Sequence, residues 1–144
     1  FPTRVSNMVL GRYMYLILWL LIVFSMEYIT MMYLYNMNEI QSREIITMCF
    51  CEVVVAMICF GEYTVCYKLG EVNKVIISFL HVIPGMAVFI IYPYLIEHKI
   101  ISDMLINFII SNRNMTLVFC ILAVTLIGYV SYLISCKICK GKEI

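Results

Sequence analysis

Four long apolar stretches constrain the fold of this chain more than any other feature of its sequence. They cover residues 13–35, 45–66, 75–96 and 115–136. Each has about 22 residues, which is enough for an α-helix to cross a hydrocarbon core of about 30 Å. Helices are expected because unpaired backbone groups are not tolerated in lipid. The sequence therefore predicts an all-α membrane protein, with four transmembrane helices in a single domain over residues 1–144.

Composition supports this interpretation and excludes several function classes. Of the 144 residues, 64% are hydrophobic and 13% are charged, whereas soluble domains are about half apolar and a quarter charged. The net charge of +1 and the lack of a basic stripe argue against a nucleic-acid partner. The sequence has no Gly-rich phosphate loop and no convincing metal-ligand pattern. We therefore predict no enzymatic activity and no cofactor or metal in this chain.

The distribution of lysine and arginine predicts the orientation in the membrane. Seven of these residues fall in the N-terminal segment, the second connector and the tail: Arg4, Arg12, Lys68, Lys74, Lys137, Lys140 and Lys142. The first and third connectors hold three, namely Arg43, Lys99 and Arg113. Because cytoplasmic loops carry the excess of positive residues, both termini of this multi-pass cell-membrane protein are predicted to be cytoplasmic.

Two further patterns concern the membrane surface. Tyrosines cluster near the ends of the spans, which predicts an interfacial aromatic belt that includes Tyr13, Tyr15, Tyr33, Tyr35, Tyr63, Tyr67, Tyr92 and Tyr94. In the third connector, apolar residues recur at helical spacing over residues 100–109, with polar residues between them. This pattern predicts a short amphipathic helix that lies on the outer face of the membrane.

Four ionisable residues within the apolar stretches are candidates for function: Glu27, Glu52, Glu62 and His81. A carboxylate near the centre of a membrane helix costs about 2.5–3.5 kcal/mol, so each needs a physical reason. Glu27 and Glu52 are expected at similar depth in adjacent antiparallel spans, where they can share a proton. Glu62 and His81 are a second possible pair. The functional interpretation is a polar pathway through the bundle; the alternative is that these groups only hold helices together or reach the headgroups.

Prolines and cysteines suggest less specific roles. Pro84 and Pro93 predict kinks in the third span, as hinges or as static bends. Cys136 and Cys139 have the C-x-x-C spacing of thiol oxidoreductases. They are predicted to face the cytoplasm, where thiols stay reduced, and this disfavours a redox function.

Three segments resemble small ABC-2-type transporter permeases. The opening PTRVSNMVLGRY, residues 2–13, is similar to the segment that reads roughly P-V-S-R-K-x-I-V-L-G-K-Y before a membrane span in that family. Its arginine is displaced, since Arg4 stands where the family usually has serine. The connector YKLGEVNK, residues 67–74, resembles the family's F-K-F-G-x-x-K/R connector, and the tail ISCKICKGKE, residues 134–143, resembles I-S-x-K-I-x-x-K-K/R-E.

The resemblance implies a fold, a function and partners. Such permeases typically have six spans, so this chain would match the last four, and residues 100–109 would match the external helix before the last span. In the family, the opening segment contacts the ATPase subunit and transmits its closure. The residues that match this segment are Pro2, Thr3, Arg4, Ser6 and Asn7.

The sequence thus predicts a permease subunit of an ABC-type exporter that moves a hydrophobic or amphipathic peptide, lipid or drug. The implied partners are a separate ATPase, which would bind ATP and Mg²⁺, a second permease copy or homologous permease, and the lipid bilayer. The alternative is a four-helix membrane accessory or structural subunit that transports nothing. A membrane thiol oxidoreductase is a third and less favoured possibility.

Overall fold

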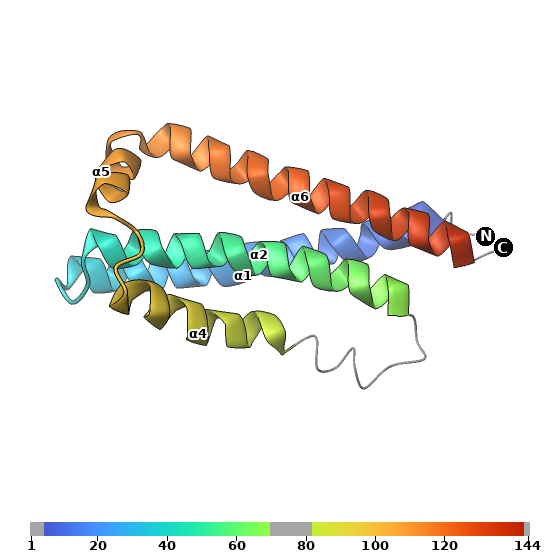
Figure 1. Cartoon of the computed structure of the whole chain (residues 1–144), viewed down its shortest axis with the longest axis horizontal. Helices are drawn as coiled ribbons and strands as arrows, with labels where there is room; N and C mark the ends of the chain where they lie inside the picture. The colour runs from blue at the N-terminus through green and yellow to red at the C-terminus, as the bar shows by residue number, and fades with distance from the viewer. Residues whose placement is uncertain (1–4, 70–81, 143–144) are drawn as a thin grey trace.

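The computed structural model describes residues 5–69 and 82–142. These residues form five α-helices and the turns between them (Figure 1). In chain order, the helices are α1 (Val5–Asn36), α2 (Ser42–Leu69), α4 (Ile83–Glu97), α5 (Asp103–Ser111) and α6 (Arg113–Lys142). The chain is an all-α membrane protein, as the apolar stretches predict.

Three of the described helices are long and apolar enough to cross a membrane: α1, α2 and α6. They contain 32, 28 and 30 residues. At a rise of about 1.5 Å per residue, each exceeds 40 Å and is longer than the hydrocarbon core. Each helix therefore continues past its predicted span, and α1 begins well before residue 13 and includes part of the polar lead-in.

The third predicted span, residues 75–96, is described only in its second half. There α4 is apolar but has 15 residues, and residues 75–81 lie outside the described part of the chain. Pro84 stands in the first turn of α4, where proline is tolerated because its missing N–H has no helical partner. The described part of the chain therefore places Pro84 at a helix start. Pro93 does lie inside α4.

The helices form an elongated bundle with α2 at its centre. α2 packs against α6 and α4, and more narrowly against α1. The beginning of α1 and the end of α6 lie at one end of the bundle, which we call the terminal end; α5 and the α1–α2 connector lie at the other, which we call the α5 end (Figure 1). The two ends of the described chain thus lie at the same end of the bundle. That this end faces the cytoplasm stays a prediction.

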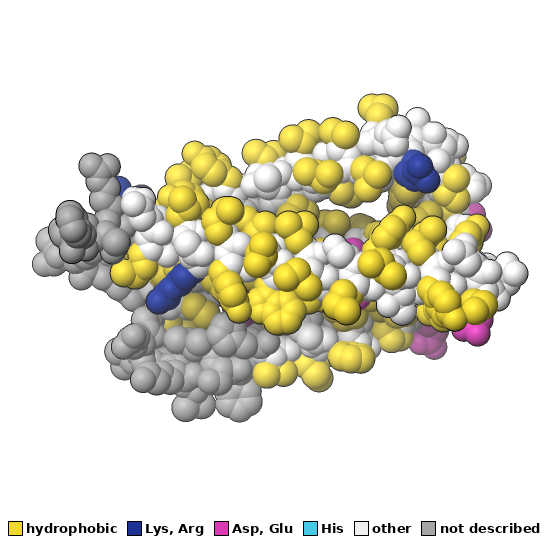
Figure 2. Space-filling model, turned by 180° about the vertical axis from the view of Figure 1, so that it is seen from behind, with side chains coloured by type: hydrophobic (Ala, Val, Ile, Leu, Met, Phe, Trp, Pro, Cys, Tyr) yellow, Lys and Arg dark blue, Asp and Glu magenta, His cyan; other side chains and the backbone are white. Residues whose placement is uncertain are grey.

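Hydrophobic side chains cover most of the bundle surface visible in Figure 2, and the acidic ones appear chiefly at the α5 end. An outer surface of this kind is suited to lipid, which cannot solvate charge. Many large apolar side chains of α1 and α6 are exposed on it, including Leu18, Ile29, Phe119 and Leu126.

Short polar interactions organise the α5 end. The backbone N–H of Gln41 donates to the Glu44 carboxylate at 2.8 Å, as in the second half of a capping box, and this begins α2. Ser102 caps α5 by accepting from the Leu105 N–H at 3.3 Å. Arg43 of α2 donates to the Ile101 carbonyl at 2.8 Å and pairs with Asp103 at 3.2 Å. These contacts hold the start of α5 against α2. The predicted amphipathic helix over residues 100–109 thus exists, shifted by a few residues, as α5.

In the terminal half of the bundle, four hydroxyl side chains are linked by hydrogen bonds between helices. We call them the hydroxyl cluster: Tyr13, Thr64, Ser131 and Ser135. The Tyr13 hydroxyl lies 2.6 Å from Ser131 Oγ and 2.8 Å from Ser135 Oγ. Thr64 Oγ1 lies 2.7 Å from Ser131 Oγ, and Ser131 donates to the Phe60 carbonyl at 2.7 Å. The cluster therefore joins α1, α2 and α6.

Tyr13 corrects the predicted aromatic belt. Its side chain is only 3% exposed, and its ring is stacked with Phe60 and in edge contact with Tyr63 and Tyr132. It belongs to the core, because α6 supplies hydrogen-bond partners for its hydroxyl. Other members of the predicted belt, including Tyr15, Tyr33 and Tyr94, are exposed at the surface.

Candidate functional site

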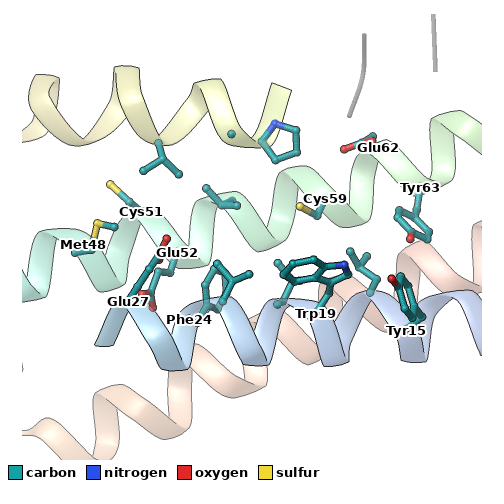
Figure 3. A pocket seen from close by; sticks show the side chains of 17 residues that line it. Tyr15, Trp19, Phe24, Glu27, Met48, Cys51, Glu52, Cys59, Glu62 and Tyr63 are labelled. Atoms are coloured by element: carbon teal, nitrogen blue, oxygen red, sulfur yellow. The ribbon is translucent and has the colours of Figure 1, made fainter. Parts of the chain in front are cut away.

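A cavity of about 660 Å³ lies between α1, α2 and the beginning of α4 (Figure 3). Its walls are mostly apolar, and three carboxylate side chains line it: Glu27 from α1, and Glu52 and Glu62 from α2. We call it the acidic cavity. A mostly apolar cavity with a few convergent polar groups is the usual form of a small-molecule site, and its volume falls within the usual range of about 300–1,000 Å³.

Glu27 and Glu52 point toward each other across the α1–α2 interface (Figure 3). Their carboxyl groups interact directly, within reach of a hydrogen bond between the two side chains. The α1–α2 hairpin explains this meeting, since Glu27 lies about 14 Å before the end of α1 and Glu52 about 15 Å after the start of α2. The structure thus brings together the pair that the sequence placed at similar depth. Two ionised carboxylates that lie next to each other repel, and either a shared proton or a bound cation relieves the repulsion.

Glu62 lines the same cavity farther toward the terminal end (Figure 3). It follows Glu52 by about 15 Å along α2, and its side chain is only 7% exposed. The predicted Glu62–His81 pair has one member, His81, outside the described residues. All three carboxylates singled out from the sequence therefore belong to one cavity.

Four aromatic side chains line the acidic cavity: Tyr15, Trp19 and Phe24 on α1, and Tyr63 on α2 (Figure 3). Sequence reasoning missed this role and assigned Tyr15 and Tyr63 to the interfacial belt. A signal was present, because Tyr15 and Trp19 are four residues apart and so lie on one face of the helix. The neighbouring faces of α1 are equally apolar, so this face does not stand out.

The residues implied in coupling lie partly within and partly outside the described part of the chain. Pro2, Thr3 and Arg4 lie outside the described residues. Ser6 and Asn7 lie in the first turn of α1, where Asn7 is exposed and Ser6 half-buried. α1 runs without interruption from these residues to Glu27, over about 30 Å. A displacement of its first turn would therefore be carried along one helix to the cavity wall.

Within residues 5–69 and 82–142, no group of three or more histidine, cysteine, aspartate or glutamate side chains could hold a metal ion. The seven cysteines are all in this part of the chain and are all free thiols. The carboxylates of the cavity stand among apolar and aromatic side chains, and such a lining is typical of sites for organic ligands.

Comparison of the chain with protein-family models, with curated proteins and with solved structures finds no match.

Proposed function

We propose that this chain is a transmembrane permease subunit of an ABC-type exporter, driven by a separate ATPase subunit. The observation that carries the proposal is the acidic cavity, because carboxyl groups inside a membrane bundle are costly and characteristically mark substrate or ion pathways. One wall of the cavity is α1, the helix whose first turn holds Ser6 and Asn7 of the segment that resembles the family's coupling segment.

In this proposal, ATP-driven closure of the partner pushes on residues 2–7. The push moves α1 relative to α2 and changes the access to the cavity between them. ATP and Mg²⁺ bind to the partner, and a second permease copy or a homologous permease completes the unit. Three segments of the chain, at residues 2–13, 67–74 and 134–143, support the assignment to the ABC-2 type.

Purification from the native membrane in mild detergent, followed by mass spectrometry, tests the proposal. We expect an ATPase with a Walker loop to co-purify in comparable amount. Charge reversal at Arg4 (Arg4→Glu) should then reduce the substrate-stimulated ATP hydrolysis of the complex. The matched control is Arg113→Glu, since Arg113 starts α6 at the α5 end, where no ATPase contact is proposed. Equal effects of the two variants, or the chain alone in the purified material, would contradict the proposal.

An accessory or structural membrane subunit is the second candidate. The hydroxyl cluster favours it, because neutral hydrogen bonds between helices hold a bundle together without providing a pathway. In this alternative, the carboxylates only hold helices together and form no pathway. A purified complex would then contain membrane subunits but no ATPase.

A further inference from the structure

We propose that the acidic cavity binds an organic cation with an apolar or aromatic body. This names the substrate class of the permease proposed above, and in that respect it rests on the proposed function. Binding itself requires neither the ATPase nor transport, so it can be measured separately.

The charge of the ligand follows from the lining of the cavity. Glu27 and Glu52 come from two different helices and converge on one point of its wall (Figure 3). Among the described residues that line the cavity there is no lysine, arginine or histidine. A cation placed beside this pair gains attraction from both carboxyl groups in surroundings where the dielectric screening is weaker than in water. An anionic ligand would be repelled by the same groups.

The organic body of the ligand follows from the aromatic side chains. Trp19 and Phe24 lie on α1 between Glu27 and Tyr15, and Tyr63 approaches from α2 (Figure 3). Aromatic rings attract cations through their faces, tryptophan most strongly, and they offer apolar contact to the rest of the ligand. A hydrated metal ion would use none of these walls, and the described residues hold no cluster suited to a metal.

Trp19 makes the proposal measurable, because it is the only tryptophan of the chain and it lines the cavity. The chain is purified in neutral maltoside micelles, which contain no tryptophan, and is titrated with tetraphenylphosphonium while Trp19 fluorescence is recorded. The matched probe is tetraphenylborate, which has similar size and apolarity but a negative charge. We expect a saturable response to the cation only. A response of equal size and midpoint to the anion would show simple partition into the micelle and would overturn the proposal.

Two variants separate charge from shape. Replacing both carboxylates (Glu27→Gln with Glu52→Gln) should weaken tetraphenylphosphonium binding by about tenfold or more, because the attraction of two close charges is lost. The matched control is Glu97→Gln, which removes an exposed carboxylate that does not line the cavity and should leave the midpoint unchanged.

Gly85→Leu tests shape with the carboxylates intact. Gly85 lines the cavity and a Cβ there meets nothing within 4 Å, so the backbone has room for a larger side chain at this part of the cavity wall. We expect it to reduce tetraphenylphosphonium binding as well.

Helical circular dichroism and a monodisperse elution profile establish that each variant is folded. Unchanged binding in the double glutamine variant would show that the carboxylates do not recognise the cation. Unchanged binding in Gly85→Leu would show that the probe does not occupy the cavity. The absence of any saturable response in the unmodified chain would exclude the proposed substrate class, while co-purification of an ATPase would still support the permease.

Discussion

The hydroxyl cluster and the acidic cavity both place polar groups inside the bundle, but they treat those groups in opposite ways. In the hydroxyl cluster, neutral side chains from three helices satisfy one another, and Ser135 is fully buried. In the cavity, two carboxyl groups from adjacent helices face each other and an open space.

The hydroxyl cluster has one consistent order of proton donation. Each hydroxyl carries a single proton, and Ser131 gives its own to the Phe60 carbonyl. Tyr13 therefore donates to Ser131, and Ser135 donates to Tyr13. These hydrogen bonds need no charged group, and every proton in them has an acceptor. The two regions thus differ in kind: the polar groups of the hydroxyl cluster are neutral and satisfy one another, whereas Glu27 and Glu52 are acidic groups that face each other beside a cavity.

The largest expected effect is at the centre of the hydroxyl cluster. Tyr13→Ala removes a buried ring and a hydroxyl bonded to two serines, and we expect a loss of about 3–5 kcal/mol in the free energy of unfolding. Unfolding by SDS in maltoside micelles, followed by circular dichroism, measures it. Tyr15→Ala is the control, since Tyr15 follows Tyr13 by two residues on α1, lines the cavity and is 61% exposed. A comparable loss in both variants would abolish the distinction between the two regions.

The second prediction concerns close packing next to the cluster. A Cβ on Gly128 would lie 3.0 Å from Phe60 Cζ, and the Phe60 ring is buried and cannot move freely. Gly128→Ala should therefore lower the free energy of unfolding, with overpacking of about 1–3 kcal/mol partly offset by the helix preference of alanine. At Gly61 a Cβ meets nothing within 4 Å, so Gly61→Ala should raise it by up to about 1 kcal/mol. Changes of the same sign in the SDS assay would argue against this packing.

The third prediction compares the two polar regions by the sign of the change in the free energy of unfolding. Glu52→Gln removes one of two facing carboxyl groups from the membrane interior, and we expect the free energy of unfolding to stay the same or to rise by about 1 kcal/mol. Ser135→Ala removes a hydroxyl from a satisfied cluster and should lower it by about 1 kcal/mol. Both are measured by the same SDS titration. A clear destabilisation by Glu52→Gln would assign the carboxylate pair to packing and favour the accessory-subunit alternative.

The smallest effect is expected at the α5 end. Asp103 is 86% exposed, so its ion pair with Arg43 is weak, and Asp103→Asn should cost less than about 0.5 kcal/mol. Arg43→Gln also removes the hydrogen bond to the Ile101 carbonyl and should cost about 1 kcal/mol. Hydrogen exchange of the α5 amides, measured by mass spectrometry, should increase more in Arg43→Gln. Equal exchange in the two variants would show that the carbonyl contact contributes nothing.

The apolar stretches are enough to predict a helical membrane protein and to single out the ionisable groups that need a physical reason. The length of an apolar stretch is set by the thickness of the bilayer, so α1, α2 and α6 could be predicted with errors only at their ends. The same reasoning singled out Glu27, Glu52 and Glu62, because charge in lipid is costly wherever the helices pack.

Which face of each helix lies inside the bundle could be learned only from the packing of the helices. Lipid and the protein interior are equally apolar, so a membrane helix need not show the amphipathic pattern that marks the buried face of a soluble one. For this reason the sequence predicted Tyr13 at the membrane surface. In the structure it lies in the core, where its hydroxyl is hydrogen-bonded to Ser131 and Ser135 of α6. For the same reason, the aromatic wall around Trp19 and the meeting of α1, α2 and α4 at one acidic cavity could be found only from the packing.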